Sequence, residues 1–235
     1  MILPVAILAG GLATRMRPLT EKIPKALIEV AGQPFICRQL AYLRDQGVQR
    51  VVLCIGYLGE QIEALVGDGA KFNLNVRYVP DGPQLLGTGG ALRQALSLLG
   101  EQFFVLYGDS FLPVDFARIQ QAFIAEHKPA LMTVLRNGNR WDKSNVIFRD
   151  QRLLEYNKQQ PRPEMDYIDY GLAVISGKIL HEYPDHKPFD LAEVYHRLSL
   201  LGLLAGYEVH ERFYEIGSRE GLKETEKYFY QKGKS

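Results

Sequence analysis

Short apolar runs alternate with amphipathic stretches through residues 2–135 of this 235-residue chain. Each run has a length typical of a strand, and the runs cover residues 2–8, 26–30, 51–55, 76–79, 103–107 and 130–135. Between them apolar side chains recur at helical spacing, for example Ile36, Leu40 and Leu43. This alternation of strand and helix predicts an α/β fold with a parallel sheet and right-handed crossover connections.

The pattern changes after residue 136, where a polar loop at 137–145 precedes shorter apolar pieces. We expect the pieces at 146–148, 153–156 and 171–176 to be antiparallel strands that cover a pocket. The remaining expected elements are a helix at 191–201, strands at 203–209 and 213–216, a last amphipathic helix, and a basic tail at 232–235 that frays. No repeat and no low-complexity linker interrupts the chain, so a single domain over residues 1–235 is predicted.

Composition and charge are those of an ordinary soluble globular protein, with 46% hydrophobic and 23% charged residues. A net charge of +1 gives no bulk field to attract nucleic acid or a membrane surface, so we expect neither partner. Cys37 and Cys54 belong to no Cys-x-x-Cys pair, which favours free thiols in a reducing compartment. The first apolar run has no basic leader and no stretch is long enough to span a bilayer, so a cytoplasmic protein is expected.

Paired glycines follow the first apolar run directly, and positive charges follow the glycines. Gly10 and Gly11 leave backbone N–H groups bare enough to approach phosphate oxygens, and Arg15, Arg17 and Lys25 add charge nearby. The spacing fits neither the phosphate loop Gly-x-x-x-x-Gly-Lys-[Ser/Thr] nor the dinucleotide fingerprint Gly-x-Gly-x-x-Gly. A tight turn with solvated charges is the alternative, but ligands of open parallel sheets bind at the carboxyl ends of the strands.

A carboxylate, Asp109, follows the buried run at 103–107, and Gly108 gives the backbone freedom to turn there. Because Mg²⁺ prefers one or two carboxylates together with phosphate oxygens, Asp109 is a candidate metal ligand. A turn or helix N-cap aspartate is the alternative. The histidines show no zinc-binding spacing, and the glycine-rich loop at 87–90 has Leu92 where a dinucleotide fingerprint needs its third glycine.

The string Gly-Gly-x-x-Thr-Arg-x-x-Pro-Leu-Thr…Pro-Lys over residues 10–25 resembles the signature of the sugar-1-phosphate nucleotidyltransferases. The resemblance covers essentially the whole chain and is densest at residues 5–30 and 84–110. It implies a Rossmann-like, doubly wound and mostly parallel sheet, with added antiparallel strands over a sugar pocket. It also implies the family reaction, in which a nucleoside triphosphate and a sugar 1-phosphate give a nucleotide-sugar and pyrophosphate, with Mg²⁺ as cofactor.

The resemblance assigns roles to residues of the first half of the chain. Arg15 and Lys25 take the catalytic positions, where they neutralise the triphosphate. The segment Leu-Gly-Thr-Gly-Gly sits against the nucleobase in the family. The implied nucleotide contacts are Leu8, Ala9, Gly10, Gly11, Gln84, Gly87, Thr88 and Gly89.

In the second half the resemblance implies a sugar-phosphate site and a second metal ligand. Glu215 stands where the family has the aspartate of Asp-x-Gly, and it would hold Mg²⁺ together with Asp109. Lys158 matches the lysine of a family Glu-Lys pair whose glutamate is Asn157 here. Trp141 is expected either to stack on the sugar or to fix its own loop. The implied sugar-phosphate contacts are Asp109, Asn145, Lys158, Asp169 and Gly171.

The segment Leu-Gly-Thr-Gly-Gly-Ala, followed by Gly-Asp-Ser-Phe at a strand end, looks most like the compact guanylyltransferases for mannose or manno-heptose 1-phosphate. We therefore expect GTP with one of these sugars, and UTP- or dTTP-dependent relatives are the alternative. A glycosyltransferase that uses nucleotide-sugars stays open, although Asp109-Ser110-Phe111 lacks the second aspartate of Asp-x-Asp. A catalytically silent nucleotide-sugar sensor and a homodimer are also left open.

Overall fold

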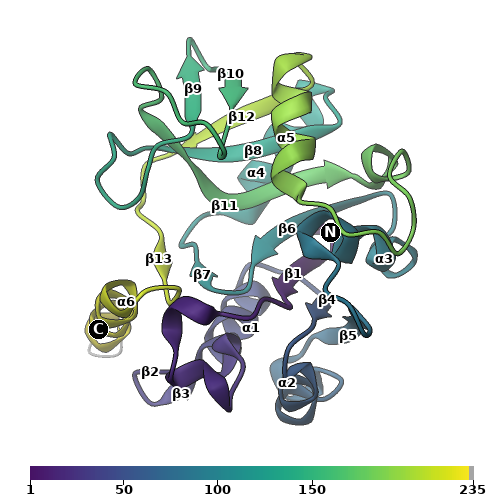
Figure 1. The fold of residues 1–235 in the computed structure, drawn as a ribbon, viewed down its shortest axis with the longest axis vertical. Helices are drawn as coiled ribbons and strands as arrows, with labels where there is room; N and C mark the ends of the chain where they lie inside the picture. The colour runs from purple at the N-terminus through teal and green to yellow at the C-terminus, as the bar shows by residue number, and fades with distance from the viewer. Residues whose placement is uncertain (233–235) are drawn as a thin grey trace.

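A mixed sheet forms the centre of the computed structural model, which describes residues 1–232 (Figure 1). Within that range the sheet has nine strands, in the order β10-β9-β11-β6-β1-β4-β5, with β8 and β12 joined on at β11. Its parallel part consists of β6 (Gln102–Tyr107), β1 (Val5–Ala9), β4 (Arg50–Ile55) and β5 (Asn75–Pro80). The predicted α/β fold with a mostly parallel central sheet is confirmed.

Helices cover both faces of the parallel strands because these strands are apolar on both faces. The helices are α1 (Phe35–Asp45), α2 (Gly59–Val66), α3 (Gly87–Leu99), α4 (Phe116–Glu126) and α5 (Leu191–Leu200). Val5 and Ile7 of β1 face a core closed by α1, α2 and α4, whereas Ala6 faces a core closed by α3 and α5. The sheet is therefore doubly wound, as the sequence predicts.

The second half of the sheet is built mainly of antiparallel pairs, which form the upper part of the molecule in Figure 1. The strand β11 (Tyr167–Ser176) runs antiparallel to β6 and to β8 (Ala130–Arg136), and β9 (Val146–Arg149) forms a hairpin with β10 (Arg152–Tyr156). The strand β12 (Leu204–Val209) confirms the strand expected at 203–209, for which the sequence indicated no direction. It pairs parallel to β8, because the crossover through α5 returns the chain in the direction of β8.

The segment after the paired glycines also differs from the expected elements. The strand predicted at residues 26–30 is reduced to β2 (Glu29–Val30), which pairs with β3 (Gln33–Pro34). The residues before it form short 3₁₀ turns, η1 (Thr14–Met16), η2 (Leu19–Glu21) and η3 (Lys25–Leu27). These turns carry the chain out from β1 and back again, so that Lys25 reaches the end of β6.

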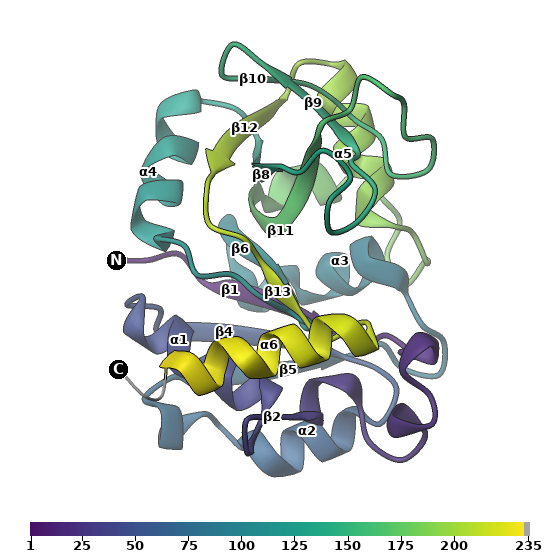
Figure 2. The ribbon, with the colours of Figure 1, turned by 90° about the vertical axis from the view of Figure 1, so that its left-hand side faces the viewer.

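A short strand, β13 (Tyr214–Glu215), returns the chain from the upper to the lower part of the molecule (Figure 2). It pairs there with β7 (Ser110–Phe111), a strand too short for the sequence pattern to predict. The last helix, α6 (Arg219–Lys232), lies across the lower part and packs against a cluster that contains Met16 and Phe35.

Two further short turns, η4 (Ala70–Phe72) and η5 (Gly177–Leu180), connect neighbouring elements. Lys232 ends α6, and residues 233–235, the rest of the tail predicted to fray, lie outside the described residues. Among residues 1–232, none of the helices combines the length and the apolar character needed to cross a bilayer.

Candidate active site

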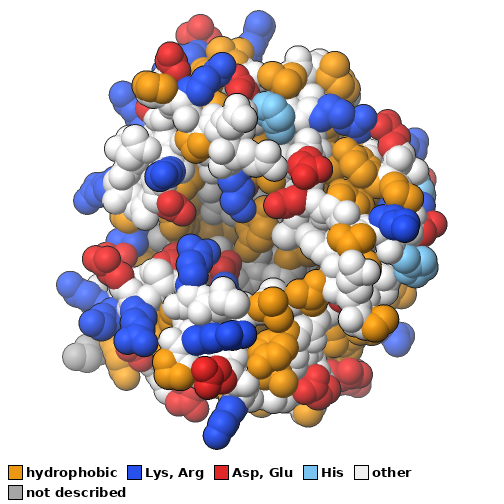
Figure 3. Space-filling model, viewed as in Figure 1, with side chains coloured by type: hydrophobic (Ala, Val, Ile, Leu, Met, Phe, Trp, Pro, Cys, Tyr) orange, Lys and Arg blue, Asp and Glu red, His pale blue; other side chains and the backbone are white. Residues whose placement is uncertain are grey.

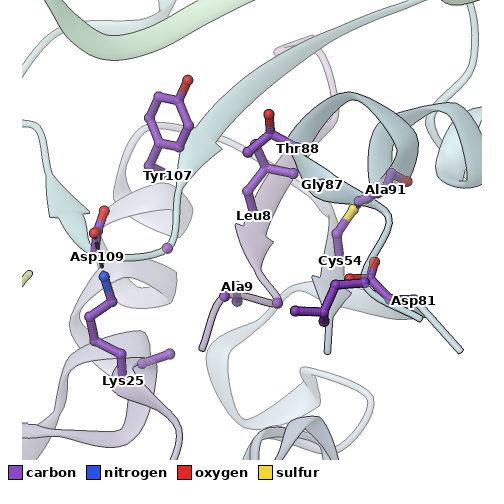
Figure 4. A pocket seen from close by; sticks show the side chains of 15 residues that line it. Leu8, Ala9, Lys25, Cys54, Asp81, Gly87, Thr88, Ala91, Tyr107 and Asp109 are labelled. Atoms are coloured by element: carbon purple, nitrogen blue, oxygen red, sulfur yellow. Dashed lines mark hydrogen bonds and ion pairs between the residues drawn. The ribbon is translucent and has the colours of Figure 1, made fainter. Parts of the chain in front are cut away.

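A first cavity, of about 230 Å³, opens where the strands of the parallel sheet end and α3 begins (Figure 4). Lys25 and Asp109 lie at one end of this cavity, and Cys54 and Asp81 lie at the other end. The residues between the two ends are largely apolar or glycine. The cavity therefore has the make-up of a nucleotide site, with a lysine and glycines at one end for phosphate and a largely apolar stretch beyond them for a base.

Most of the predicted nucleotide contacts meet at this cavity, although they come from two distant segments. Gln84 is exposed and Gly89 is buried, and neither of them lines the cavity. The predicted contacts that do line it are Leu8, Ala9, Gly10, Gly11, Gly87 and Thr88.

The two glycines after β1 have different surroundings. A Cβ at Gly10 would lie 3.2 Å from the backbone N of Gly56 and 3.3 Å from Oδ2 of Asp81, so close packing of the strand ends favours glycine there. A Cβ at Gly11 would meet nothing within 4 Å, so the backbone at Gly11 is open. An open glycine backbone near Lys25 suits a phosphate group.

The glycines at the start of α3 make room for a segment from much later in the chain. The carbonyl oxygen of Phe189 accepts a hydrogen bond from the N–H of Gly89 (3.0 Å), and a Cβ at Gly89 would overlap the Phe189 ring. The hydroxyl of Thr88 donates to Oδ1 of Asp190 at 2.7 Å. Packing against residues 189–190 therefore accounts for Gly89, which the sequence assigned to the nucleobase.

An ion pair joins η3 to the end of β6. The ammonium group of Lys25 donates to Oδ2 of Asp109 at 2.7 Å, and the two side chains are 21% and 28% exposed. Asp109 lines the first cavity and also a second, larger cavity. The pair therefore stands at the junction between the two.

The second cavity, of about 420 Å³, lies between the end of β6, β11, β13 and the polar loop after β8. The face of the molecule in Figure 3 is hollowed at its centre, with Lys and Arg side chains at the edge of the hollow. Arg15, predicted to neutralise the triphosphate, and Asp109, predicted to hold Mg²⁺, both line this cavity. The other predicted residues that line it are Asn145, Lys158, Asp169, Gly171 and Glu215.

Hydrogen bonds hold Asp169 in the second cavity. Its Oδ1 accepts from the N–H of Gly171 and its own N–H donates to Oδ1 of Asn145, both at 2.9 Å. Burial raises the pKa of the Asp169 carboxyl to about 6, which the Gly171 hydrogen bond and the charge of Lys158 partly offset. A carboxyl group with such a pKa can donate or accept a hydrogen bond near neutral pH, which suits a sugar hydroxyl.

Trp141 lines the same cavity and is held by its neighbours. Its ring lies edge-on to Phe213, with centroids 6.0 Å apart. The guanidinium groups of Arg140 and Arg212 lie 4.9 Å and 5.3 Å from its ring centroid. These contacts fix the loop, and the position in the lining leaves contact with a sugar open.

Asp109 and Glu215 approach each other across Gly217. A Cβ at Gly217 would lie 2.9 Å from Oε2 of Glu215 and 3.2 Å from Oδ2 of Asp109, so a side chain at this position would crowd both carboxylates. Glu215 is oriented by the N–H of Ser218 (3.0 Å), by the N–H of Gly217 and by the Ser218 hydroxyl. No group of three or more His, Cys, Asp or Glu side chains is arranged for a metal in the described range. Two neighbouring carboxylates suit Mg²⁺, which takes its remaining ligands from phosphate and water, although the ammonium group of Lys25 now lies 2.7 Å from Oδ2 of Asp109.

Sequence reasoning missed residues that the structure places in the lining. Tyr107 lines both cavities and lies between them, and Asp81 lines the first. Both stand at or directly after the end of a strand of the parallel sheet, which is the same signal that identified Asp109.

The matching family defines the class of protein. Residues 5–144 match the family described as nucleotidyl transferase, which is more than half of the chain, so the chain belongs to this family of enzymes.

The chain is also similar to individual named enzymes and to a solved structure. The chain is 40% identical over 134 residues to the N-acetylmuramate alpha-1-phosphate uridylyltransferase of Neisseria meningitidis, which is 56% of this chain and 58% of that protein. It is 27% identical over 191 residues to the D-glycero-alpha-D-manno-heptose 1-phosphate guanylyltransferase of Campylobacter jejuni, 80% of this chain and 82% of that protein. The solved structure of HddC from Yersinia pseudotuberculosis complexed with GMP-PN matches with a TM-score of 0.80 at 27% identity, covering 97% of this chain and 100% of that chain.

Proposed function

We propose that the protein transfers a nucleotidyl group from a nucleoside triphosphate to a sugar 1-phosphate, giving a nucleotide-sugar and pyrophosphate. The observation that carries this proposal is the junction of two cavities at the Lys25–Asp109 pair. Two cavities with a shared charged junction can bring two anionic substrates together. The names of the Neisseria and Campylobacter relatives, a uridylyltransferase and a guanylyltransferase, support the same reaction class.

The reaction needs no general base. An oxygen of the sugar phosphate, already ionised at neutral pH, attacks the α-phosphorus, and the new P–O bond forms while the bond to the pyrophosphate oxygen breaks. The protein must hold two polyanions in line and stabilise the charge that develops. In this proposal Lys25 contacts the triphosphate from the first cavity, Arg15 contacts it from the second cavity, and Lys158 faces the sugar phosphate.

Asp109 and Glu215 are the residues that would hold Mg²⁺. A bound Mg²⁺ would supply positive charge that offsets the charge of the phosphate groups. The hydrogen bonds from Gly217 and Ser218 orient the Glu215 carboxylate, and Lys25 balances part of the negative charge of Asp109.

Within this reaction class we propose GTP as the nucleotide and a manno-heptose or mannose 1-phosphate as the acceptor. The guanylyltransferase name of the Campylobacter relative supports this choice, since that match covers 80% of the chain. The 40% identity to the Neisseria uridylyltransferase makes UTP with N-acetylmuramate 1-phosphate the second candidate.

Pyrophosphate release from GTP, UTP, dTTP and ATP, each with a panel of sugar 1-phosphates, tests these proposals. Release that depends on GTP and a manno-type sugar supports the first candidate, and release that depends on UTP and N-acetylmuramate 1-phosphate supports the second. Sugar transfer from a nucleotide-sugar to an acceptor would identify a glycosyltransferase instead. Binding of nucleotide-sugar without any turnover would identify a sensor.

We also propose a cellular compartment and an assembly for the protein. Cys37 and Cys54 are free thiols, which agrees with a reducing compartment such as the cytoplasm. A homodimer without nucleic-acid or membrane partners is the assembly to test, by sedimentation of the purified protein with and without nucleotide.

A further inference from the structure

Gln39 is a buried glutamine of α1 whose amide group reaches the segment that carries Asp109. The residue is 2% exposed. Its Nε2 donates to the carbonyl oxygen of Tyr107 at 3.1 Å and to that of Ser110 at 2.8 Å. Because Tyr107 ends β6 and Ser110 begins β7, one amide group holds both ends of the turn that contains Asp109.

The partners of Gln39 determine which way its amide group faces. Both carbonyl oxygens are acceptors, so the NH₂ group with its two donors must face them. The other amide atom, Oε1, is buried and has no hydrogen-bond partner among the described residues. The side chains around the small cavity beside Gln39 are apolar or aromatic apart from Ser110. The amide group therefore leaves its acceptor unpaired on one side while it satisfies two carbonyl oxygens of the turn on the other.

Backbone hydrogen bonds hold the middle of the same turn. The N–H of Gly108 donates to the carbonyl oxygen of Leu8, and the carbonyl oxygen of Asp109 accepts from the N–H of Ile216, both at 2.9 Å. These contacts come from β1 and from the end of β13, whereas Gln39 comes from α1. Three separate elements therefore determine where the turn lies, and Gln39 is the side chain among them.

The position of this turn affects both carboxylates that would hold Mg²⁺. In Figure 4 Asp109 stands on the turn and meets the ammonium group of Lys25. Glu215 lies opposite Ser110 in the pairing of β13 with β7. A turn that could shift at Tyr107 or Ser110 would move the Asp109 carboxylate relative to Glu215. It would also move Tyr107, which lines both cavities.

Building on the proposed nucleotidyl transfer, we propose that Gln39 is a positioning residue for this reaction. Its amide group fixes the turn at residues 107–110 and so sets how far the Asp109 carboxylate stands from that of Glu215. Gln39 lines neither of the two cavities, so it acts through the backbone that it holds.

Gln39→Met tests the contact with the turn, because it keeps the length of the side chain and removes both donors. In hydrogen exchange of the full chain without metal or nucleotide, amides of residues 108–111 should exchange roughly 10-fold faster, since two hydrogen bonds that resist opening are lost. Gln120→Met is the matched control. Gln120 also bonds two backbone groups, the N–H of Leu3 and the carbonyl oxygen of Met1, but lies outside both cavities. Its loss should leave exchange at residues 108–111 unchanged.

Pyrophosphate release measures the consequence for the site. We expect the Mg²⁺ concentration that gives half-maximal turnover to rise roughly 10- to 100-fold in Gln39→Met, the usual effect of losing a contact that orients a metal ligand from outside. Gln120→Met should keep the wild-type value. A general loss of stability would act on turnover in both variants, whereas a positioning role changes the Mg²⁺ dependence in Gln39→Met alone.

The outcomes separate this assignment from the proposed function. Unchanged exchange at residues 108–111, or faster exchange with an unchanged Mg²⁺ dependence, would overturn the positioning role and leave nucleotidyl transfer standing. Absence of pyrophosphate release from the wild type with every triphosphate would overturn the proposed function, and the role of Gln39 with it. If Gln39→Met does not fold, Gln39→Asn replaces it in both measurements, because its amide is one methylene too short to reach both carbonyl oxygens.

Discussion

Lys25 is the residue whose position best explains the charge arrangement of the site. Its ammonium group is 2.7 Å from Asp109 and lines the first cavity, so it balances a carboxylate and faces the phosphate end at once. A lysine suits this position because its charge sits on a long stem that can follow a moving phosphate.

Lys25→Met should remove that charge while keeping most of the apolar stem. We expect kcat/KM for the proposed reaction to fall by roughly 10²–10³, as when one preorganised group that stabilises developing charge is lost. Thermal unfolding should change little, because exposed or partly exposed ion pairs contribute about 0–1 kcal/mol. Lys22→Met, in the same segment but outside the cavities, is the matched control. Near-normal turnover of Lys25→Met would contradict the assigned role.

Asp169 should make stability depend on pH. Its pKa is about 6 in the folded protein against 3.8 as the ordinary value, so the folded protein binds this proton more tightly than the unfolded chain. The free energy of unfolding should therefore fall as pH rises from about 4 to about 6, by up to about 3 kcal/mol. Asp169→Asn should lose this dependence and gain stability relative to the wild type over that range. Urea unfolding of both proteins at several pH values measures the difference between their free energies of unfolding. A difference that does not change with pH would contradict this prediction.

At the scale of elements, the start of α3 depends on the segment that packs against it. Phe189 receives hydrogen bonds from α3, and Thr88 and Asp190 are joined by a further one. The nucleotide cavity is thus bounded by an element whose position is set by residues a hundred positions later in the chain. The packing of α3 against residues 189–190 requires small residues at this contact, as a bound ligand would.

Gly89→Ala should destabilise the protein, because the added Cβ would overlap the Phe189 ring. We expect a loss of about 1–3 kcal/mol in the free energy of unfolding, the usual effect of overpacking. Gly11→Ala is the matched control, since its Cβ would meet nothing within 4 Å, and its stability should stay within about 0.5 kcal/mol. Denaturant midpoints compare the two variants. Equal midpoints would show that residues 187–190 yield to the added methyl group.

At the scale of the whole molecule, the two parts of the fold meet where β13 pairs with β7. This pairing brings Glu215 opposite Ser110, and the N–H of Ile216 donates to the carbonyl oxygen of Asp109 at 2.9 Å. The two carboxylates that fit Mg²⁺ therefore come from different parts of the chain and are brought together by backbone hydrogen bonds.

Removal of Mg²⁺ with EDTA should abolish turnover without unfolding the protein. Lys25 already pairs with Asp109, and the N–H of Ser218 already holds Glu215, so the carboxylates do not depend on the metal for their positions. The unfolding temperature without nucleotide should stay within about 2 °C, where 1 kcal/mol corresponds to roughly 2–4 °C for a domain of this size. Activity should return on adding Mg²⁺. A large fall in the unfolding temperature would mean that the metal supports the fold.

Much of the site followed from local sequence. Gly11, Lys25 and Asp109 were identified because a strand end, a glycine pair and a following carboxylate are all visible within a few residues. Asp81 was missed although it also follows a strand, because nothing local says that its side chain faces a cavity. Gly89 was assigned to the base by the family resemblance, and its packing against Phe189 could not be predicted because Phe189 is far away in sequence.

The amino-acid sequence by itself determined the order of strands and helices, the parallel core and the strand ends that carry charge. Hydrophobic periodicity and glycine spacing are local properties, so they can be read without coordinates. Only the tertiary structure decided that β12 runs parallel to β8, that β13 carries Glu215 to Asp109, and that Arg15 and Lys158 face one cavity. Those arrangements depend on backbone pairing and packing between segments far apart in the chain, which have no signature within either segment alone.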